Sequence, residues 1–429
     1  MKPATLSVVL VLSLTACHEV PEAPSVTSPP PATALTITLD TITGPVLDVS
    51  DQWDKPTLFV GSDQSVHILA FNNWNGRERY HGCANECDDP AHWFGATSDT
   101  FATSSEYDYN SSSVLASDGF HAVRNAWYIY GYYGPTILYN FCPGACDLAA
   151  NWSVAPLFLD RGWMPGDLGG GGQQLAADAS GALHMLLFDG GLWTTYGAPA
   201  SATTLQYARC AAACGDSANW RETVLDSSQV GLYDPKLIAV APDGIVHIFY
   251  AKGATLIHAS CAAGCATTTT WQSGAMPGIT LLSGPGNRAQ LAYLRTLSLA
   301  FGRGGTLDLA YEDGSGRVAL ATCAGPCSAP GIWSSATLPL VTSDVSLAAS
   351  GAGTLYLATT DRHPAVSSCA TDCLNPASWK TVPIPTALGG GASSFGGHVA
   401  VAVDSAGGVL LASTNGGGPQ VLQYSRLLP

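Results

Sequence analysis

The sequence predicts an all-β fold, a seven-bladed β-propeller of four-stranded blades, and three observations lead to it. A phrase with the frame C-x3-C-x5-W occurs six times in the 429 residues. Short apolar runs with the two-residue period of a β-strand precede each cysteine pair. The two ends of the chain together supply one further unit. A four-stranded meander of about 45 to 65 residues, repeated in tandem, is the blade of a propeller.

Residues 1–16 have the features of a secretory signal peptide. Lys2 is followed by an apolar run that is too short to span a membrane. The run ends in Leu14-Thr15-Ala16-Cys17, which resembles the lipobox of bacterial lipoproteins. The resemblance implies cleavage before Cys17 and lipid attachment to it, which would also explain the odd count of 13 cysteines. An ordinary signal peptide with a free cysteine is the alternative.

Residues 17–33 contain the lipidated cysteine and a Pro-rich linker, and residues 34–429 are expected to form a single propeller domain. We therefore expect an exported, membrane-anchored lipoprotein that faces the periplasm or the cell surface. Its contact with the membrane would be the lipid alone. The net charge of −15 argues against nucleic acid and against a polybasic membrane surface.

The fourth repeat shows the predicted strands of one blade. Runs at 236–240, 246–250 and 256–259 are followed by Trp271, which begins the fourth strand. The first two runs recur at 57–60 with 66–71, 175–177 with 183–188, 297–301 with 307–311, and 345–348 with 355–358. In the second repeat they are less clear, and we place them at 120–123 and 127–130.

The chain ends predict how the ring closes. After the sixth Trp come runs at 398–403, 409–413 and 421–424, without a cysteine pair or a Trp. Residues Leu35–Leu39 alternate cleanly, and we expect them to pair with 420–426 as the missing fourth strand. This closure resembles that of Trp-Asp repeat propellers. A six-bladed ring, with residues 34–39 and the C-terminal tail packed outside it, is the alternative.

The cysteines of each repeat are expected to form a disulfide within their own pair. Residues i and i+4 of one helical turn lie roughly 6 Å apart at Cα, which is within disulfide range, and an exported chain meets an oxidising compartment. Zinc is the rival, but no further His or Cys recurs in register to complete a site. The fixed Trp is interpreted as a packing residue. The pairs are Cys83/Cys87, Cys142/Cys146, Cys210/Cys214, Cys261/Cys265, Cys323/Cys327 and Cys369/Cys373.

Histidines recur at one position of the second strand, and such a repeated position is interpreted as structural: His67, His184 and His247, with Asp308 and Tyr356 in later repeats. The chain as a whole resembles secreted bacterial propellers, including sialidase-like proteins. However, it has no S-x-D-x-G-x-x-W Asp box, and its arginines show no frame that indicates a carboxylate-binding triad. We therefore assign no catalytic residue and favour binding over catalysis.

Function is expected on the face that carries the second turns and the links between blades, because these loops are long and irregular. Around the first three blades they are rich in aromatic residues, which stack on sugars, and in carboxylates, which accept hydrogen bonds. We expect an envelope-anchored binding module for a glycan or a protein there. No cofactor is expected, although these carboxylates could hold Ca²⁺. The predicted ligand-binding residues are Trp163, Trp193, Asp160, Asp167, Tyr107, Tyr109 and Trp53.

Two other functions remain open. A sialidase-like glycoside hydrolase or lyase would use carboxylates in the central funnel, where paired groups leave no sequence spacing. A purely structural envelope lipoprotein is the third interpretation.

Overall fold

The computed structural model describes the chain in separate stretches, and everything below concerns these alone. They are residues 46–48, 53–72, 77–97, 111–129, 132–157, 174–189, 204–227, 236–281, 297–325, 327, 332–342, 344–360, 364–384, 398–414 and 422–427. None of the helices in these stretches is both long enough and apolar enough to cross a membrane.

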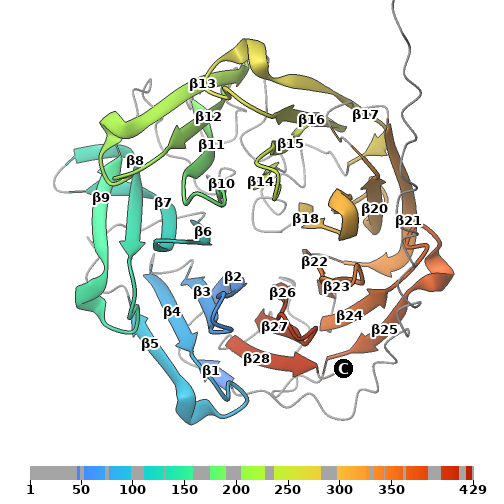
Figure 1. The fold of residues 1–429 in the computed structure, drawn as a ribbon, viewed down its shortest axis with the longest axis horizontal. Helices are drawn as coiled ribbons and strands as arrows, with labels where there is room; N and C mark the ends of the chain where they lie inside the picture. The colour runs from blue at the N-terminus through green and yellow to red at the C-terminus, as the bar shows by residue number, and fades with distance from the viewer. Residues whose placement is uncertain are drawn as a thin grey trace, which may run out of the picture. The chain divides into compact units, whose positions relative to one another are not determined.

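Seven antiparallel four-stranded sheets stand around a common axis, which confirms the seven-bladed propeller (Figure 1). The first strand of each blade lies nearest the axis, and the fourth lies on the outer rim. The inner strands are β2 (Trp53–Val60), β6 (Ser111–Ala116), β10 (Gln174–Ala177), β14 (Lys236–Val240), β18 (Leu297–Phe301), β22 (Asp344–Ala349) and β26 (Val399–Val403).

The remaining strands follow in chain order. The second strands are β3 (Val66–Asn72), β7 (Gly119–Ile129), β11 (Leu183–Asp189), β15 (Val246–Lys252), β19 (Leu307–Glu312), β23 (Leu355–Thr360) and β27 (Val409–Thr414). The third strands are β4 (Arg77–Cys83), β8 (Tyr132–Cys142), β12 (Thr204–Cys210), β16 (Thr255–Cys261), β20 (Arg317–Cys323), β24 (Pro364–Cys369) and β28 (Leu422–Leu427). The fourth strands are β5 (Trp93–Thr97), β9 (Ser153–Leu157), β13 (Trp220–Asp226), β17 (Gln272–Thr280), β21 (Trp333–Val341), β25 (Lys380–Pro383) and β1 (Val46–Asp48).

The hydrophobic core is divided among the seams between neighbouring blades. Each of the seven seams has its own buried apolar cluster, such as the one that joins Leu205 and Tyr207 of blade three to Val246 and Ile248 of blade four. Successive side chains of a strand lie on opposite sides of the sheet. Each blade therefore contributes one face to the seam before it and the other face to the seam after it. A single blade could not bury both of its faces alone.

The strand that closes the ring differs from the prediction. β1 pairs with β28 through Val46↔Gln423 and Asp48↔Leu422, so the last blade is indeed completed by an N-terminal strand. The predicted segment Leu35–Leu39 lies outside the described residues. A three-residue strand is too short to show a period in the sequence, whereas Leu35–Leu39 alternates over five residues.

Blade two also differs from the prediction. Its inner strand is β6, and residues 120–123 together with 127–129 belong to one long second strand, β7. The serines of β6 resemble a loop in the sequence, yet Ser112 and Ser113 are buried and bonded. The Ser113 hydroxyl lies 2.6 Å from that of Thr57 in blade one, and Ser112 Oγ accepts a hydrogen bond from the Leu175 N–H of blade three at 2.9 Å.

Candidate functional site

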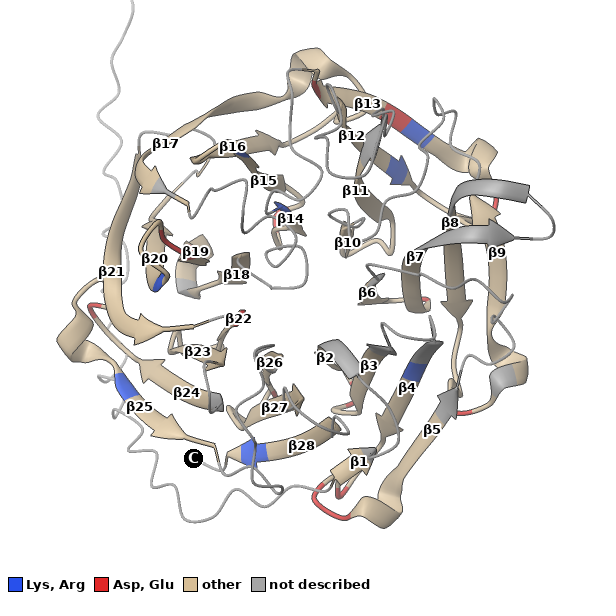
Figure 2. Cartoon of the chain, turned by 180° about the vertical axis from the view of Figure 1, so that it is seen from behind, with Lys and Arg blue, Asp and Glu red and all other residues tan. Residues whose placement is uncertain are grey.

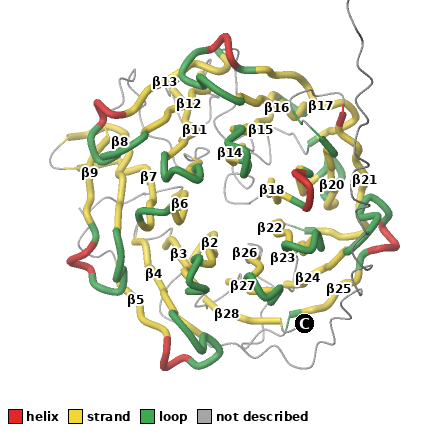
Figure 3. The backbone as a smooth tube through the Cα atoms, in the orientation of Figure 1, coloured by secondary structure: helices red, strands yellow, loops and turns green. Residues whose placement is uncertain are grey.

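The two faces of the ring are built from different connections. We call the face with the first hairpin of each blade and the C-x3-C turns the hairpin face. We call the opposite face, where the inner strands begin and the blades are linked, the link face. Short 3-10 helices mark the C-x3-C turns on the outer rim (Figure 3), namely η1 (Pro90–His92), η3 (Ala149–Asn151), η4 (Ser217–Asn219), η5 (Thr268–Thr270) and η8 (Pro376–Ser378). A further one, η6 (Arg303–Gly305), lies in the first hairpin of blade five.

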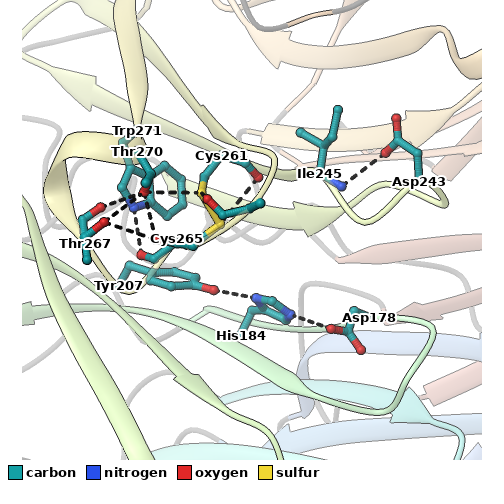
Figure 4. Close-up of a disulfide and its surroundings, with 12 residues drawn as sticks. Asp178, His184, Tyr207, Asp243, Ile245, Cys261, Cys265, Thr267, Thr270 and Trp271 are labelled. Carbon is teal, nitrogen blue, oxygen red and sulfur yellow. Dashed lines mark hydrogen bonds and ion pairs between the residues drawn. A yellow bond between two sulfur atoms is a disulfide. The ribbon is translucent and has the colours of Figure 1, made fainter.

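Three chains of hydrogen bonds run from the hairpin face into the blades, with the carboxylates toward the surface and the tyrosines buried. In blade three, Asp178 Oδ2 lies 3.2 Å from His184 Nε2, and His184 Nδ1 lies 2.6 Å from the Tyr207 hydroxyl (Figure 4). The same arrangement occurs in two other blades: Asp118, His121 and Tyr139 in blade two, and Asp63, Ser65, His67 and Tyr80 in blade one. In blade four, His247 faces His258 at 3.1 Å instead of a tyrosine.

The imidazole and phenol groups of these chains are held in their uncharged forms, as the pKa shifts of blades three and four show. Burial lowers the pKa of His184, with the hydrogen bond to Asp178 opposing it. Burial also lowers the pKa of His247 to about 4 and that of His258 to about 3. Burial raises the pKa of the Tyr207 hydroxyl well above its ordinary value. The arrangement repeats from blade to blade, and its tyrosines and most of its histidines are buried, which supports the interpretation that the recurring histidines are structural.

The sequence analysis missed His121. The reason is the wrong assignment of the strands in blade two, because His121 follows Phe120 as His67 follows Val66 and His184 follows Leu183. The position directly after the first residue of the apolar run is the signal that could have identified it.

The disulfide turns complete this face. All six bonds form within their own C-x3-C pair, as predicted, with Cα–Cα distances of 5.6–5.9 Å. The bonds are Cys83–Cys87, Cys142–Cys146, Cys210–Cys214, Cys261–Cys265, Cys323–Cys327 and Cys369–Cys373.

The cysteines are structural residues and not part of a ligand-binding surface. The first cysteine of each pair ends a third strand and is buried. Among the second cysteines, Cys373 is half-buried and the other five are 4–9% exposed, namely Cys87, Cys146, Cys214, Cys265 and Cys327. They pack in the apolar clusters between blades, so the sulfur atoms are withdrawn from the surface that a ligand could reach.

The Trp that follows each cysteine pair joins its turn to the neighbouring blade. In five of the six turns its indole N–H donates to the carbonyl of the second cysteine, for example Trp271 to Cys265 at 2.9 Å. The ring packs on the preceding blade, and the centroids of Trp271 and Tyr207 lie 5.0 Å apart (Figure 4). Each turn therefore clamps its own blade to the one before.

The link face has a different chemistry. Figure 2 shows the seven inner strands around the axis, with few charged residues near it. The inner strands carry four charged residues, Asp54, Lys55, Lys236 and Asp344, and each lies within the first three positions of its strand, at the link face. Farther along, the described inner strands are mostly small or apolar. Polar groups near the axis are therefore concentrated on the link face.

Asp344 and His398 form the best-defined polar pair there. The Asp344 side chain has no exposed surface, and its Oδ2 accepts a hydrogen bond from the Val399 N–H at 2.9 Å. The same oxygen lies 3.5 Å from His398 Nδ1, whose side chain is 5% exposed. The pair joins blade six to blade seven. In the described residues, no group of three or more His, Cys, Asp or Glu side chains could hold a metal ion.

The predicted ligand-binding residues fall almost entirely outside the described stretches. Trp163, Trp193, Asp160, Asp167, Tyr107 and Tyr109 lie in the undescribed segments, as does Cys17. Trp53 is the first residue of β2 and therefore begins an inner strand at the link face. The second turn of blade four is short, with residues 253–254 joining β15 to β16, whereas residues 281–296 and 384–398 separate the last strands of blades four and six from the next inner strands.

No protein-family model matches this chain. None of the curated proteins matches it either. Solved structures do match over most of its length. The NanB sialidase from Streptococcus pneumoniae aligns with 90% of this chain and 70% of its own, at 10% identity and a TM-score of 0.48. The polysaccharide lyase Uly1 aligns with 91% of this chain and 95% of its own, at 11% identity and a TM-score of 0.50.

A lectin from Aleuria aurantia, solved in complex with Fucα1-6GlcNAc, aligns with 81% of this chain and 100% of its own, at 11% identity and a TM-score of 0.43. At 11% identity, the likeness to Uly1 shows a shared fold and nothing finer.

Proposed function

We propose that this chain is a carbohydrate-binding propeller, anchored to a bacterial envelope by lipid on Cys17, and that its ligand lies on the link face. The supporting observation is the contrast between the two faces. The hairpin face is occupied by hydrogen-bonded chains of Asp, His and Tyr, whose tyrosines are buried, and by disulfide turns that join the blades. The charged residues of the inner strands instead all lie at the link face.

The sequence supplies the recognition groups for that face. Trp163 and Trp193 offer flat rings for stacking on sugars, and Asp160 and Asp167 offer acceptors for hydroxyl groups. Tyr107, Tyr109 and Trp53 would extend the same surface. The net charge of −15 favours a neutral glycan over an acidic one, because an anionic ligand would be repelled. Uly1 is named a polysaccharide lyase, so the fold is compatible with a carbohydrate-directed protein.

The test is binding of the wild-type protein and of a Trp163→Ala/Trp193→Ala variant to a glycan array, followed by calorimetry on each positive glycan. We expect the double variant to lose at least about tenfold in affinity, since each stacking contact contributes on the order of 1 kcal/mol. Its unfolding midpoint should stay unchanged. Phe94→Ala, which removes a partly exposed ring from β5, is the matched control and should bind normally.

The same experiment separates binding from catalysis. Incubating the positive glycans with the wild-type protein and measuring new chain ends would reveal cleavage, which would favour the hydrolase or lyase alternative. A double variant with the glycan profile of the wild type would place the site elsewhere.

A further inference from the structure

One carboxyl group lies at the edge of an apolar seam. Glu312 is the last residue of β19, at the link face of blade five, and only 8% of it is exposed. Ala310, two residues earlier, packs with Val318 and with Val345 of blade six. Because side chains alternate along a strand, Glu312 points toward the same seam between blades five and six.

The Glu312 carboxyl is incompletely paired. Its Oε2 atom is buried and has no hydrogen-bond partner within the described part of the chain. An ionised carboxylate in this position lacks both water and a counter-charge, so the protonated form is favoured. Burial, with a smaller contribution from the neighbouring Asp313, raises the pKa of Glu312 to about 7.

The charged groups on the surrounding strands do not neutralise it. β18 and β21 carry none. β20 begins with the exposed Arg317, and no ion pair joins it to Glu312 in the described stretches. β22 begins with Asp344, whose carboxylate is directed to blade seven by its bond to Val399. Asp313 accepts hydrogen bonds from Ser315, Arg317 and Thr337.

The other parts of this seam are held independently of Glu312. At the hairpin face, Trp379 of blade six packs in the cluster that contains Leu320 of blade five, and its indole N–H donates to the Cys373 carbonyl at 2.8 Å. Near the axis, the Leu347 N–H donates to Ser298 Oγ at 2.8 Å. At the link face, Thr342 donates to the Thr360 carbonyl, which ties the link to blade six.

We propose that the link-face end of the seam between blades five and six is a proton-controlled joint, closed while Glu312 carries a proton and opened when Glu312 ionises. Opening gives the carboxylate access to water on the link face. Acid therefore closes this side of the ring, and neutral pH loosens it. This proposal goes beyond the proposed function, and its test needs no ligand. The joint and the carbohydrate-binding function can therefore be refuted separately.

The direction and range of the effect follow from proton linkage. In the open state the carboxyl has its ordinary pKa, near 4.5, and in the closed state its pKa is about 7. The closed state therefore holds a proton that the open state releases. The opening equilibrium rises by up to about tenfold per pH unit between these values and levels off above the higher one.

Amide hydrogen exchange, measured at several pH values, tests the proposed joint. The protection of amide groups in blade three serves as the internal reference. After correction for the intrinsic exchange rate, protection of residues 307–320 should fall roughly tenfold between pH 5.5 and 6.5 relative to residues 183–188. Glu312→Gln should abolish this pH dependence. Glu312→Leu should stay closed at every pH. Glu86→Gln, which changes a carboxyl group whose side chain is 76% exposed in blade one, should keep the wild-type profile.

An identical pH profile in the wild type and in Glu312→Gln would overturn the proposal. So would a wild-type joint whose protection rises with pH, or Glu312→Leu with the pH dependence of the wild type.

Discussion

The seam between blades three and four and the seam between blades six and seven are held together in different ways. In the first, the disulfide turn of blade four carries Trp271 onto Tyr207, which is bonded to His184. Blade seven has neither cysteine pair nor Trp, so the second seam lacks such a clamp on its outer side. There, the inner strands are joined instead, because Asp344 Oδ2 and Ser346 Oγ accept from the N–H groups of Val399 and Val401.

The difference between the two seams shows which part of the sequence repeat joins neighbouring blades. The C-x3-C-x5-W turn joins a blade to the preceding blade at the outer rim. The hairpin-face histidines lie beneath this contact. Side-chain to backbone bonds near the axis also occur in clamped seams, for example from the Leu347 N–H to Ser298 Oγ, but between blades six and seven they act without an outer clamp. The apolar layer, in contrast, is present in both seams, with Tyr207 and Ile248 in one and Val366 and Leu411 in the other.

Removing the outer clamp should have the largest effect. Trp271→Ala deletes both the ring contact with Tyr207 and the hydrogen bond to Cys265, and we expect a loss of about 3 kcal/mol in the free energy of unfolding. Trp271→Phe keeps a ring but not the indole N–H and should cost about 1 kcal/mol. Chemical denaturation measures both. Equal losses in the two variants would mean that the hydrogen bond, not the packing, holds the seam.

The inner bonds of the other seam should come next. Asp344→Ala removes the acceptor of the Val399 N–H and the ion pair with His398, and we expect a loss of about 2–3 kcal/mol. Asp344→Asn keeps an oxygen acceptor in place and should cost clearly less. The same denaturation assay applies. If Asp344→Ala is as stable as the wild type, the inner bonds do not replace the clamp.

The sequence predicted the propeller well because the fold depends on signals that are local and repeated. The strands of blade four were expected at 236–240, 246–250 and 256–259 and are found at Lys236–Val240, Val246–Lys252 and Thr255–Cys261. The cysteine pairing followed from spacing alone. The errors arose where the signal was short or polar. β1 has three residues, and β6 begins with three serines, of which Ser112 and Ser113 are bonded to other blades.

The candidate site was less predictable. The role of Asp344 depends on a hydrogen bond to a residue 55 positions away, and no sequence pattern shows such a contact. Glu312 is buried because the apolar face of another blade packs beside it. Its neighbours in the chain do not indicate this burial. Apart from Trp53, the aromatic residues proposed for the ligand fall between the described strands, in segments whose lengths follow no repeat.

Opening one disulfide should have a smaller effect than removing its Trp. Cys261→Ser with Cys265→Ser should cost about 2 kcal/mol, because the bond closes only a short loop of the unfolded chain. The matched variant is Cys369→Ser with Cys373→Ser, which opens the clamp between blades five and six. Mass mapping without reduction checks the pairing, and denaturation measures the loss. Bridges between different repeats would contradict the clamp.

The smallest effect should come from acid, and it concerns the hairpin-face histidines, which the seam between blades six and seven lacks. The hairpin-face position holds His184 and His247 in blades three and four but Tyr356 and Leu410 in blades six and seven. Burial lowers the pKa of His258, the partner of His247, to about 3. The unfolded chain therefore binds a proton near pH 6.5 that the folded chain refuses, so the stability contributed by the neutral imidazole is present above pH 6.5 and is lost as the pH falls.

Replacing His258 tests this directly, because His258→Tyr gives blade four the His–Tyr pair of the three blades before it. Between pH 6.5 and 5.5 the wild type should lose about 1 kcal/mol more stability than the variant, since one depressed titration has been removed. Leu410→Val in blade seven, a change of similar burial without a titrating group, should leave the pH dependence of the wild type intact. Urea denaturation at the two pH values gives the difference. Parallel stability curves for the wild type and His258→Tyr would mean that the His247–His258 pair does not make the seam between blades four and five sensitive to acid.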